Sequence, residues 1–153
     1  MTVMRQFVFS LCLVLAGFSA ALAQGSEKGG EKGGREIGPI RSSSAFAEVS
    51  LRKAELEADI ESYLADYTEQ NPKVIDARNE LRFLVGDLDR IFAVRPTEVA
   101  RLTEALGKMI VRRAALEADV ERLMRTYSKD HPNVKRAKRK AEIFESAIRE
   151  ILG

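Results

Sequence analysis

The sequence predicts an all-α protein built from two tandem antiparallel helical hairpins, and three observations lead to this fold class. Residues 52–91 recur without gaps 60 residues later as residues 112–151, with 12 of 40 positions identical. Apolar residues follow a heptad pattern through both copies, and a proline interrupts each copy at the same place. Self-similarity at a fixed period indicates that one supersecondary unit is used twice.

Residues 1–23 have the composition of a secretory signal peptide. Arg5 precedes an apolar run over residues 7–22, and residues 21–23 read Ala-Leu-Ala, a small-residue cleavage pattern. The run is shorter than the roughly 20 residues of a membrane-spanning helix. We therefore expect cleavage before Gln24 and a periplasmic or secreted protein without a transmembrane segment; the alternative is a retained anchor. Cleavage also removes Cys12, the only cysteine, and with it any disulfide.

Residues 24–43 are expected to form a flexible linker. They contain the tetrapeptide Glu-Lys-Gly-Gly twice and few apolar side chains. Such a composition has little to bury and is typical of a flexible tether.

The first hairpin is expected to span residues 44–94, with a first helix from about residue 44 to residue 67. Asn71 precedes Pro72, and proline is favoured at the first position of a helix while asparagine is favoured as its N-cap. The second helix should therefore begin at Pro72. The heptad positions of this hairpin are Phe46, Val49, Leu56, Ile60, Tyr63, Tyr67, Val74, Ala77, Leu81, Leu84, Leu88 and Ile91.

The second hairpin, residues 95–153, repeats this plan. Its first helix is expected to start near Thr97, and His131 stands before Pro132 where Asn71 stood. Tyr67 and Tyr127, which precede the two turns by the same distance, are expected to pack on the turn prolines, Pro72 and Pro132. The heptad positions are Leu106, Met109, Leu116, Val120, Leu123, Tyr127, Val134, Ala137, Ala141, Phe144, Ile148 and Ile151.

The heptad register predicts which residues face each other across a hairpin. In the second hairpin it places Glu117 beside Lys138 and Asp119 beside Lys140. In the first it places Glu57 beside Arg78. Such exposed pairs are worth at most about 1 kcal/mol and select the register more than they stabilise it. Two glycines, Gly86 and Gly107, fall at outward positions of predicted helices.

The two repeats carry opposite charge. Residues 52–91 have a net charge of −4 and residues 112–151 of +4. If the hairpins attract each other within one chain, they form an up-down four-helix bundle in which each covers the apolar seam of the other. If they stay extended, the seams are buried against a second chain, and the opposite charges act between molecules.

A basic cluster opens the last predicted helix and is the candidate binding site. The helix macrodipole disfavours cations at the N-terminal end of a helix, so the position of these cations requires an explanation. One interpretation is a solvated face whose lysines join the expected ion pairs. The other is a patch for phospholipid headgroups or an anionic envelope polymer. Because no aromatic residue lies among the cations, nucleic acid is disfavoured as a partner. The cluster comprises Lys135, Arg136, Lys138, Arg139 and Lys140.

The sequence gives little support for catalysis. His131, the only histidine, stands where Asn71 stands in the first copy, so we expect both to cap a helix. The carboxylates of the helices are expected on solvated faces, where raised pKa values and acid or base catalysis are not indicated. We predict no enzyme and no catalytic, cofactor-binding or metal-binding residue.

The second turn, with Leu116 and Leu123 upstream, reads Tyr127, three residues, His131, Pro132, Asn133 and Val134. It resembles a segment in the periplasmic coiled coil of polysaccharide chain-length regulators and exopolysaccharide export co-polymerases. The resemblance covers about 25 residues of each repeat, and the first copy has asparagine in place of the histidine. It implies a periplasmic hairpin that assembles with others or contacts export machinery.

These observations together predict an exported, non-catalytic helical repeat protein with a structural or interaction role in the bacterial cell envelope. Its partner would be an anionic envelope polymer, an envelope protein or a second copy of the chain. One alternative is a dedicated binding module for anionic polymers or lipid headgroups. Another is a periplasmic chaperone or adaptor that offers its apolar seam to clients.

Overall fold

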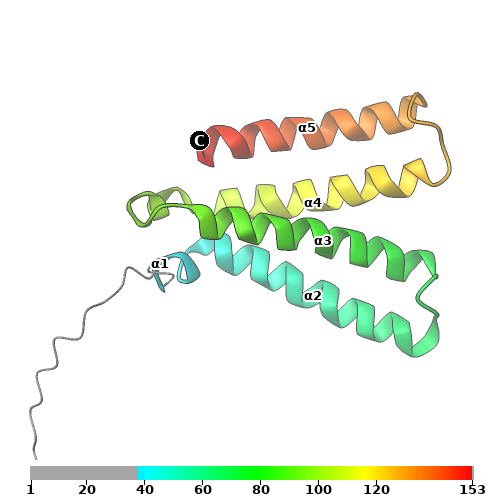
Figure 1. Cartoon of the computed structure of the whole chain (residues 1–153), viewed down its shortest axis with the longest axis horizontal. Coiled ribbons are helices and arrows are strands. Elements are labelled where there is room, and N and C mark those ends of the chain that lie inside the picture. Colours follow the sequence, from blue (N-terminus) through cyan, green and yellow to red (C-terminus); the bar gives the residue numbers. More distant parts are fainter. Residues whose placement is uncertain (1–37, 153) are drawn as a thin grey trace, which may run out of the picture. The chain divides into compact units, whose positions relative to one another are not determined.

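A computed structural model describes residues 38–152, and these residues form helices and no strand (Figure 1). The predicted signal peptide and residues 24–37 of the predicted linker lie outside this part. No helix between residues 38 and 152 combines the length and apolar character needed to span a bilayer. The elements in chain order are α1 (Gly38–Arg41), α2 (Ser44–Asp66), α3 (Pro72–Ala93), η1 (Pro96–Arg101), α4 (Glu104–Met124) and α5 (Pro132–Leu152).

The end of the predicted linker is structured. Residues 38–41 form α1, and Ile40 is fully buried in the core. Ser43 then caps α2, because its Oγ accepts a hydrogen bond from the backbone N–H of Phe46 at 3.3 Å. The expectation of a flexible segment as far as residue 43 is therefore wrong for residues 38–43, where one isoleucine and a serine cap are enough to order the chain.

The link between the hairpins also differs from expectation. The first helix of the second repeat does not start near Thr97, because residues Pro96–Arg101 form the 3-10 helix η1 and α4 begins at Glu104. Thr103 caps α4 by accepting a hydrogen bond from the N–H of Leu106 at 3.3 Å. Leu102 is buried, and its carbonyl accepts from the N–H of Ala45 at 3.2 Å. The buried Leu102, which ends η1, and the N-cap Thr103 interrupt the helix that the apolar pattern predicts.

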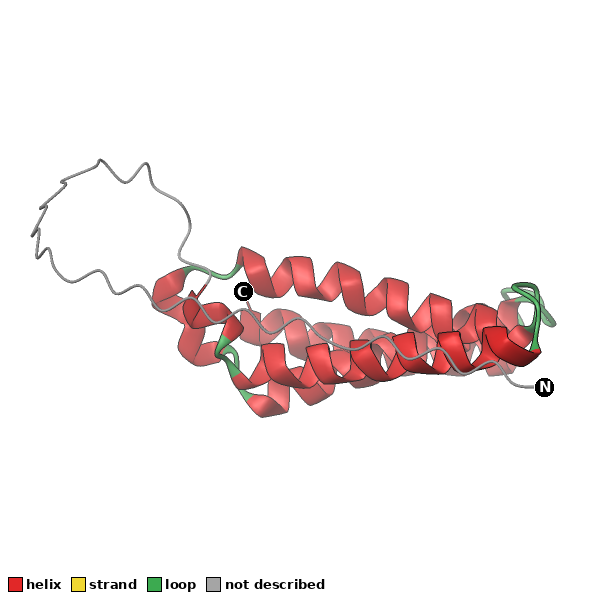
Figure 2. Ribbon diagram, turned by 90° about the horizontal axis from the view of Figure 1, so that it is seen from below, coloured by secondary structure: helices red, strands yellow, loops and turns green. Residues whose placement is uncertain are grey.

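The two repeats pack against each other within the chain. The helices α2 and α3 form one hairpin and α4 and α5 the other, and α4 also packs on both α2 and α3. Figures 1 and 2 show both hairpin turns at one end of the helices and the link at the other. The helix α5 has its main contact with α4 alone. Hairpin 1, as we call α2 and α3, is thus covered by α4, whereas α5 lies at the edge of the packed helices.

The heptad positions make up most of the core. The residues among them that are buried are Val49, Leu56, Ile60, Val74, Ala77, Leu84, Ile91, Leu106, Leu116, Val120, Val134, Ala141 and Ile148. Among the remaining heptad positions, Tyr67 and Tyr127 are 42% and 40% exposed, and the others are half-buried. Both tyrosines precede a turn, where the seam between the two helices ends.

The two glycines within helices, Gly86 of α3 and Gly107 of α4, have different surroundings. Gly86 faces open space, as expected, since an added Cβ would have no neighbour within 4 Å. Gly107 is buried, contrary to expectation, and an added Cβ would lie 2.9 Å from the Cα of Ala45 and 2.8 Å from the Cβ of Glu48. The absence of a side chain at Gly107 lets α4 approach the backbone of α2 closely.

Candidate functional site

The candidate binding residues lie on the first half of α5, whose start is fixed by the turn before it. The backbone N–H of Asn133 donates to Nδ1 of His131 at 3.2 Å. In the first repeat the N–H of Lys73 donates to Oδ1 of Asn71 at 2.9 Å. The side chains of Asn71 and His131 therefore both cap the helix that follows them. Pro132, like Pro72, occupies the first position of its helix.

The two turn tyrosines have different partners. Tyr127 stacks on His131, with ring centroids 4.2 Å apart. The Nζ of Lys73 lies 5.4 Å from the ring centroid of Tyr67, within the range of a cation–π contact. Aromatic stacking in one turn and a cation contact in the other thus fix these tyrosines, and their packing on the turn prolines stays a prediction.

Four of the five cations of the basic cluster are exposed and Lys138 is half-buried, and the cluster is only partly paired. Lys135 contacts Asp130 of the preceding turn at 3.1 Å, and Arg136 donates to Oδ1 of Asn133 at 2.6 Å. Arg139 is 78% exposed and lies 3.7 Å from a carboxylate oxygen of Glu142.

The ion pairs expected across the hairpins do not form. Among residues 38–152, no carboxylate pairs with Lys138 or Lys140. Asp119 instead accepts from Arg122 at 2.7 Å, one turn along its own helix, and this hydrogen bond raises the pKa of Arg122. In the first hairpin, Glu57 pairs with Lys53 rather than with Arg78. A partner three or four residues away on the same helix is within reach of a charged side chain. Asp119 and Glu57 pair with such partners instead of with residues of the facing helix.

The cations of α5 divide between two sides of the helix. Lys135, Lys138 and Arg139 are spaced three and one residues apart and share one side, whereas Arg136 and Lys140 lie four residues apart on the other. The first side runs on to Glu142. The second runs on to Ile143, an exposed isoleucine.

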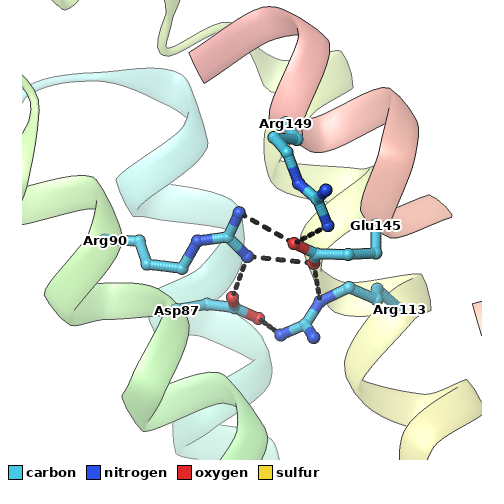
Figure 3. A network of polar contacts seen from close by, with 5 residues as sticks. All are labelled: Asp87, Arg90, Arg113, Glu145 and Arg149. Atoms are coloured by element: carbon cyan, nitrogen blue, oxygen red, sulfur yellow. Dashed lines mark hydrogen bonds and ion pairs between the residues drawn. The ribbon is translucent and has the colours of Figure 1, made fainter. Parts of the chain in front are cut away.

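A buried charge network, which the sequence did not reveal, joins three helices (Figure 3). At its centre the carboxylate of Asp87, only 1% exposed, accepts from Nη2 of Arg113 at 2.5 Å and from Nη1 of Arg90 at 3.2 Å. The side chain of Arg113 is itself 12% exposed. A buried carboxylate requires such partners because its desolvation is costly.

Glu145 extends the network to α5. Its carboxylate oxygens lie 3.1 and 3.3 Å from Arg90, 3.4 Å from Nε of Arg113 and 3.5 Å from Arg149. Three arginines thus surround two carboxylates. The only hint in the sequence was that Arg113 breaks the heptad of its helix, and nothing local identifies Asp87 as its partner.

Beside this network, a hollow of about 560 Å³ opens where the ends of α3 and α5 meet η1. There the carboxylate of Glu98 accepts hydrogen bonds from Nε and Nη2 of Arg95, at 2.9 and 2.8 Å, and lies 3.5 Å from Arg101. The hydrogen bond from Arg95 lowers the pKa of Glu98. Each of these guanidiniums has a carboxylate partner. The hollow is lined by Arg90, Ala93, Val94, Arg95, Glu98, Arg101, Arg149 and Leu152.

No reactive group stands out among residues 38–152. Groups of three or more metal-ligating side chains are absent from this range. The titratable groups with shifted pKa values are arginines, one lysine and carboxylates held in their charged forms by ion pairs. Comparison of the chain with protein families, curated proteins and solved structures finds no match.

Proposed function

We propose that this chain is an exported, non-catalytic interaction protein of the bacterial cell envelope that binds an anionic polymer or lipid surface through the basic cluster of α5. The observation that carries the proposal is the state of that cluster. Among the residues that the structure describes, Lys138 and Lys140 have no carboxylate partner; Lys140 is exposed, Lys138 is half-buried, and Arg139 is 78% exposed. Exposed, unneutralised cations near one end of a helix attract phosphate and carboxylate groups.

The arrangement proposed for the body is an up-down four-helix bundle. Short connections between α2 and α3 and between α4 and α5, together with the packing of α4 on hairpin 1, support it. The proposed location in the periplasm rests on the signal-like residues 1–23. The resemblance of the second turn to a segment of polysaccharide chain-length regulators favours a link to polysaccharide export.

The alternative of a chaperone or adaptor receives less support. It requires an apolar seam that is open to clients. Leu56, Val74 and Leu84 of the first seam and Leu116 and Val134 of the second are buried instead.

Co-sedimentation of the purified chain with envelope fractions, at low and high salt, tests the proposal. We expect binding at low salt that is lost at high salt, because exposed charges are screened. The variant Lys135→Glu/Arg139→Glu should bind at least about tenfold more weakly. The matched control is Arg41→Glu/Arg112→Glu, which changes the net charge equally at exposed positions outside the cluster and should bind like the original chain.

Two outcomes would contradict the proposal. Binding that persists at high salt would indicate a protein partner at an apolar surface. If neither salt condition gives binding, the anionic-surface function is abandoned.

A further inference from the structure

Three exposed aliphatic side chains mark surfaces that the internal repeat leaves without a partner. Leu51 and Ile143 are each 59% exposed and Val85 is 43% exposed. The residues that correspond to Leu51 and Ile143 in the other repeat, Val111 and Phe83, pack against the core. The residue that corresponds to Val85 is Glu145, which contacts Arg90 of the other hairpin. Each exposed side chain therefore occupies a position that is an interface in the other repeat.

The first surface is a stripe on α2. The residues of α4 that correspond to this stripe face hairpin 1, because Gly107 contacts α2 and Ala118 lines a hollow with Leu56 and Ala77. Their spacing of four, three and four residues places them along one side of the helix. The α4 residues, buried or packed on the core, are Gly107, Val111, Ala114 and Ala118. Their α2 counterparts, all exposed, are Ala47, Leu51, Ala54 and Ala58, which we call the outer stripe of α2.

The second surface is a flank of α5. In α3, the corresponding residues face α4: Asp76 pairs with Arg125, and Asp87 pairs with Arg113. The α3 residues are Asp76, Glu80, Phe83 and Asp87. Their α5 counterparts are Arg136, Lys140, Ile143 and Ala147, which we call the outer flank of α5; three are exposed and Ala147 is half-buried. On α4, Ala105 is likewise exposed, whereas its counterpart Ala45 is fully buried.

We propose that the outer stripe of α2 of one copy docks on the outer flank of α5 of another copy, in the way that α4 docks on hairpin 1. A second copy is the fitting occupant because its α2 presents the same small and aliphatic side chains at the positions through which α4 packs. Within the chain, the two repeats form this interface once. Each chain also keeps one unpaired copy of either side, the outer stripe on α2 and the outer flank on α5. This proposal goes beyond the binding of an anionic surface.

Charge complementarity supports the same pairing. Within the chain, Ala115 and Asp119 of α4 share a hollow with Asp76 and Glu80 of α3. The counterparts between two copies are Glu55 and Asp59 of α2 against Arg136 and Lys140 of α5. Two carboxylates thus meet two cations between copies. Within one chain the equivalent positions hold three carboxylates, each of which pairs with an arginine. Arg136 and Lys140 are also cations of the basic cluster that lie away from Lys135 and Arg139 on the helix.

The interface is heterologous, because a different surface of each copy takes part. Copies joined in this way form a ring if the rotation closes and an open chain if it does not. In either case the assembly continues the internal repeat from one molecule into the next, as stacked repeats do in solenoid proteins.

Sedimentation velocity of the purified chain over a concentration series tests the inference. We expect species larger than the monomer at high concentration, with association that weakens as salt is raised. Leu51→Glu removes one side of the interface and Ile143→Glu the other, so each variant alone should be a monomer. Their equimolar mixture should form a dimer and nothing larger, because each variant keeps the surface that the other lacks.

The control is Ser146→Glu, since Ser146 and its counterpart Gly86 are both exposed and the position is an interface in neither repeat. This variant should associate like the original chain. Circular dichroism checks that each variant folds, and Leu51→Gln and Ile143→Gln replace any that does not. A chain that stays monomeric at all concentrations would overturn the inference, as would variants that fail to pair when mixed.

Discussion

The two repeats share a sequence plan but differ in what covers them. The position held by Lys53 in the first repeat and by Arg113 in the second illustrates the difference. Lys53 pairs with Glu57 on its own exposed helix face, whereas Arg113 is buried against Asp87 of the other hairpin. Equivalent basic residues therefore play unequal parts, and the packing between hairpins, rather than the local sequence, decides which charge matters for stability.

The largest expected effect comes from Arg113→Met. It leaves the buried carboxylate of Asp87 with Arg90 alone, and removing one partner of a buried pair typically costs about 3 kcal/mol or more. The equivalent change Lys53→Met should cost less than about 0.5 kcal/mol, since that pair is exposed. Urea denaturation of the two variants measures both values. Equal losses would show that the two positions are equivalent after all.

A smaller effect is expected where α4 meets α2. Gly107→Ala gives the second repeat the residue that the first has at position 47, but its Cβ would lie 2.9 Å from the backbone of α2. Overpacking of this kind costs about 1–3 kcal/mol, against a gain of about 1 kcal/mol in helix propensity. We therefore expect net destabilisation in thermal unfolding. The control, Gly86→Ala, faces open space and should stabilise the protein.

The turns should be more nearly interchangeable than the helices. Because Asn71 and His131 accept the same capping hydrogen bond, Asn71→Ala should cost about 1 kcal/mol. His131→Asn, which gives the second turn the residue of the first, should retain the cap and change the free energy of unfolding by less than that. Stability losses in the reverse order would assign His131 a role beyond capping, with its stacking on Tyr127 as the first candidate.

The smallest difference concerns pH. A hydrogen bond from Arg78 lowers the pKa of Glu69 in the first turn, whereas the second turn has Lys129 and Lys138 at these positions. A lowered carboxylate pKa stabilises the fold above the ordinary carboxyl range, and the contribution is lost as the pH falls through the lowered pKa. An NMR titration should show Glu69 returning toward its ordinary pKa in Arg78→Ala. The variant Lys138→Ala should leave Glu69 unaffected.

Much of each hairpin was predictable because its signals are local. The start of α3 at Pro72, the cap at Asn71 and most buried heptad positions depend on residues within a few turns of one another. The positions of the basic cluster on α5 follow in the same way.

The rest depends on how the hairpins face each other, which no local pattern encodes. Asp87 is one acidic residue among many until α4 brings Arg113 to it. The heptad predicts an outward position for Gly107 because it describes contacts within a hairpin and not those between hairpins. The apolar pattern does not predict the break before α4 because the burial of Leu102 is a tertiary effect.

The central position of α4 has a consequence for how the molecule opens. The helix α4 touches α2, α3 and α5, whereas α5 rests mainly on α4. Detaching α5 leaves the contacts among the other three helices in place. Any opening that releases α4 breaks its contacts with α2, α3 and α5 together. Amide hydrogens of α5 should therefore exchange with solvent through a local opening of lower free energy, while those of α4 should exchange only when the whole body unfolds.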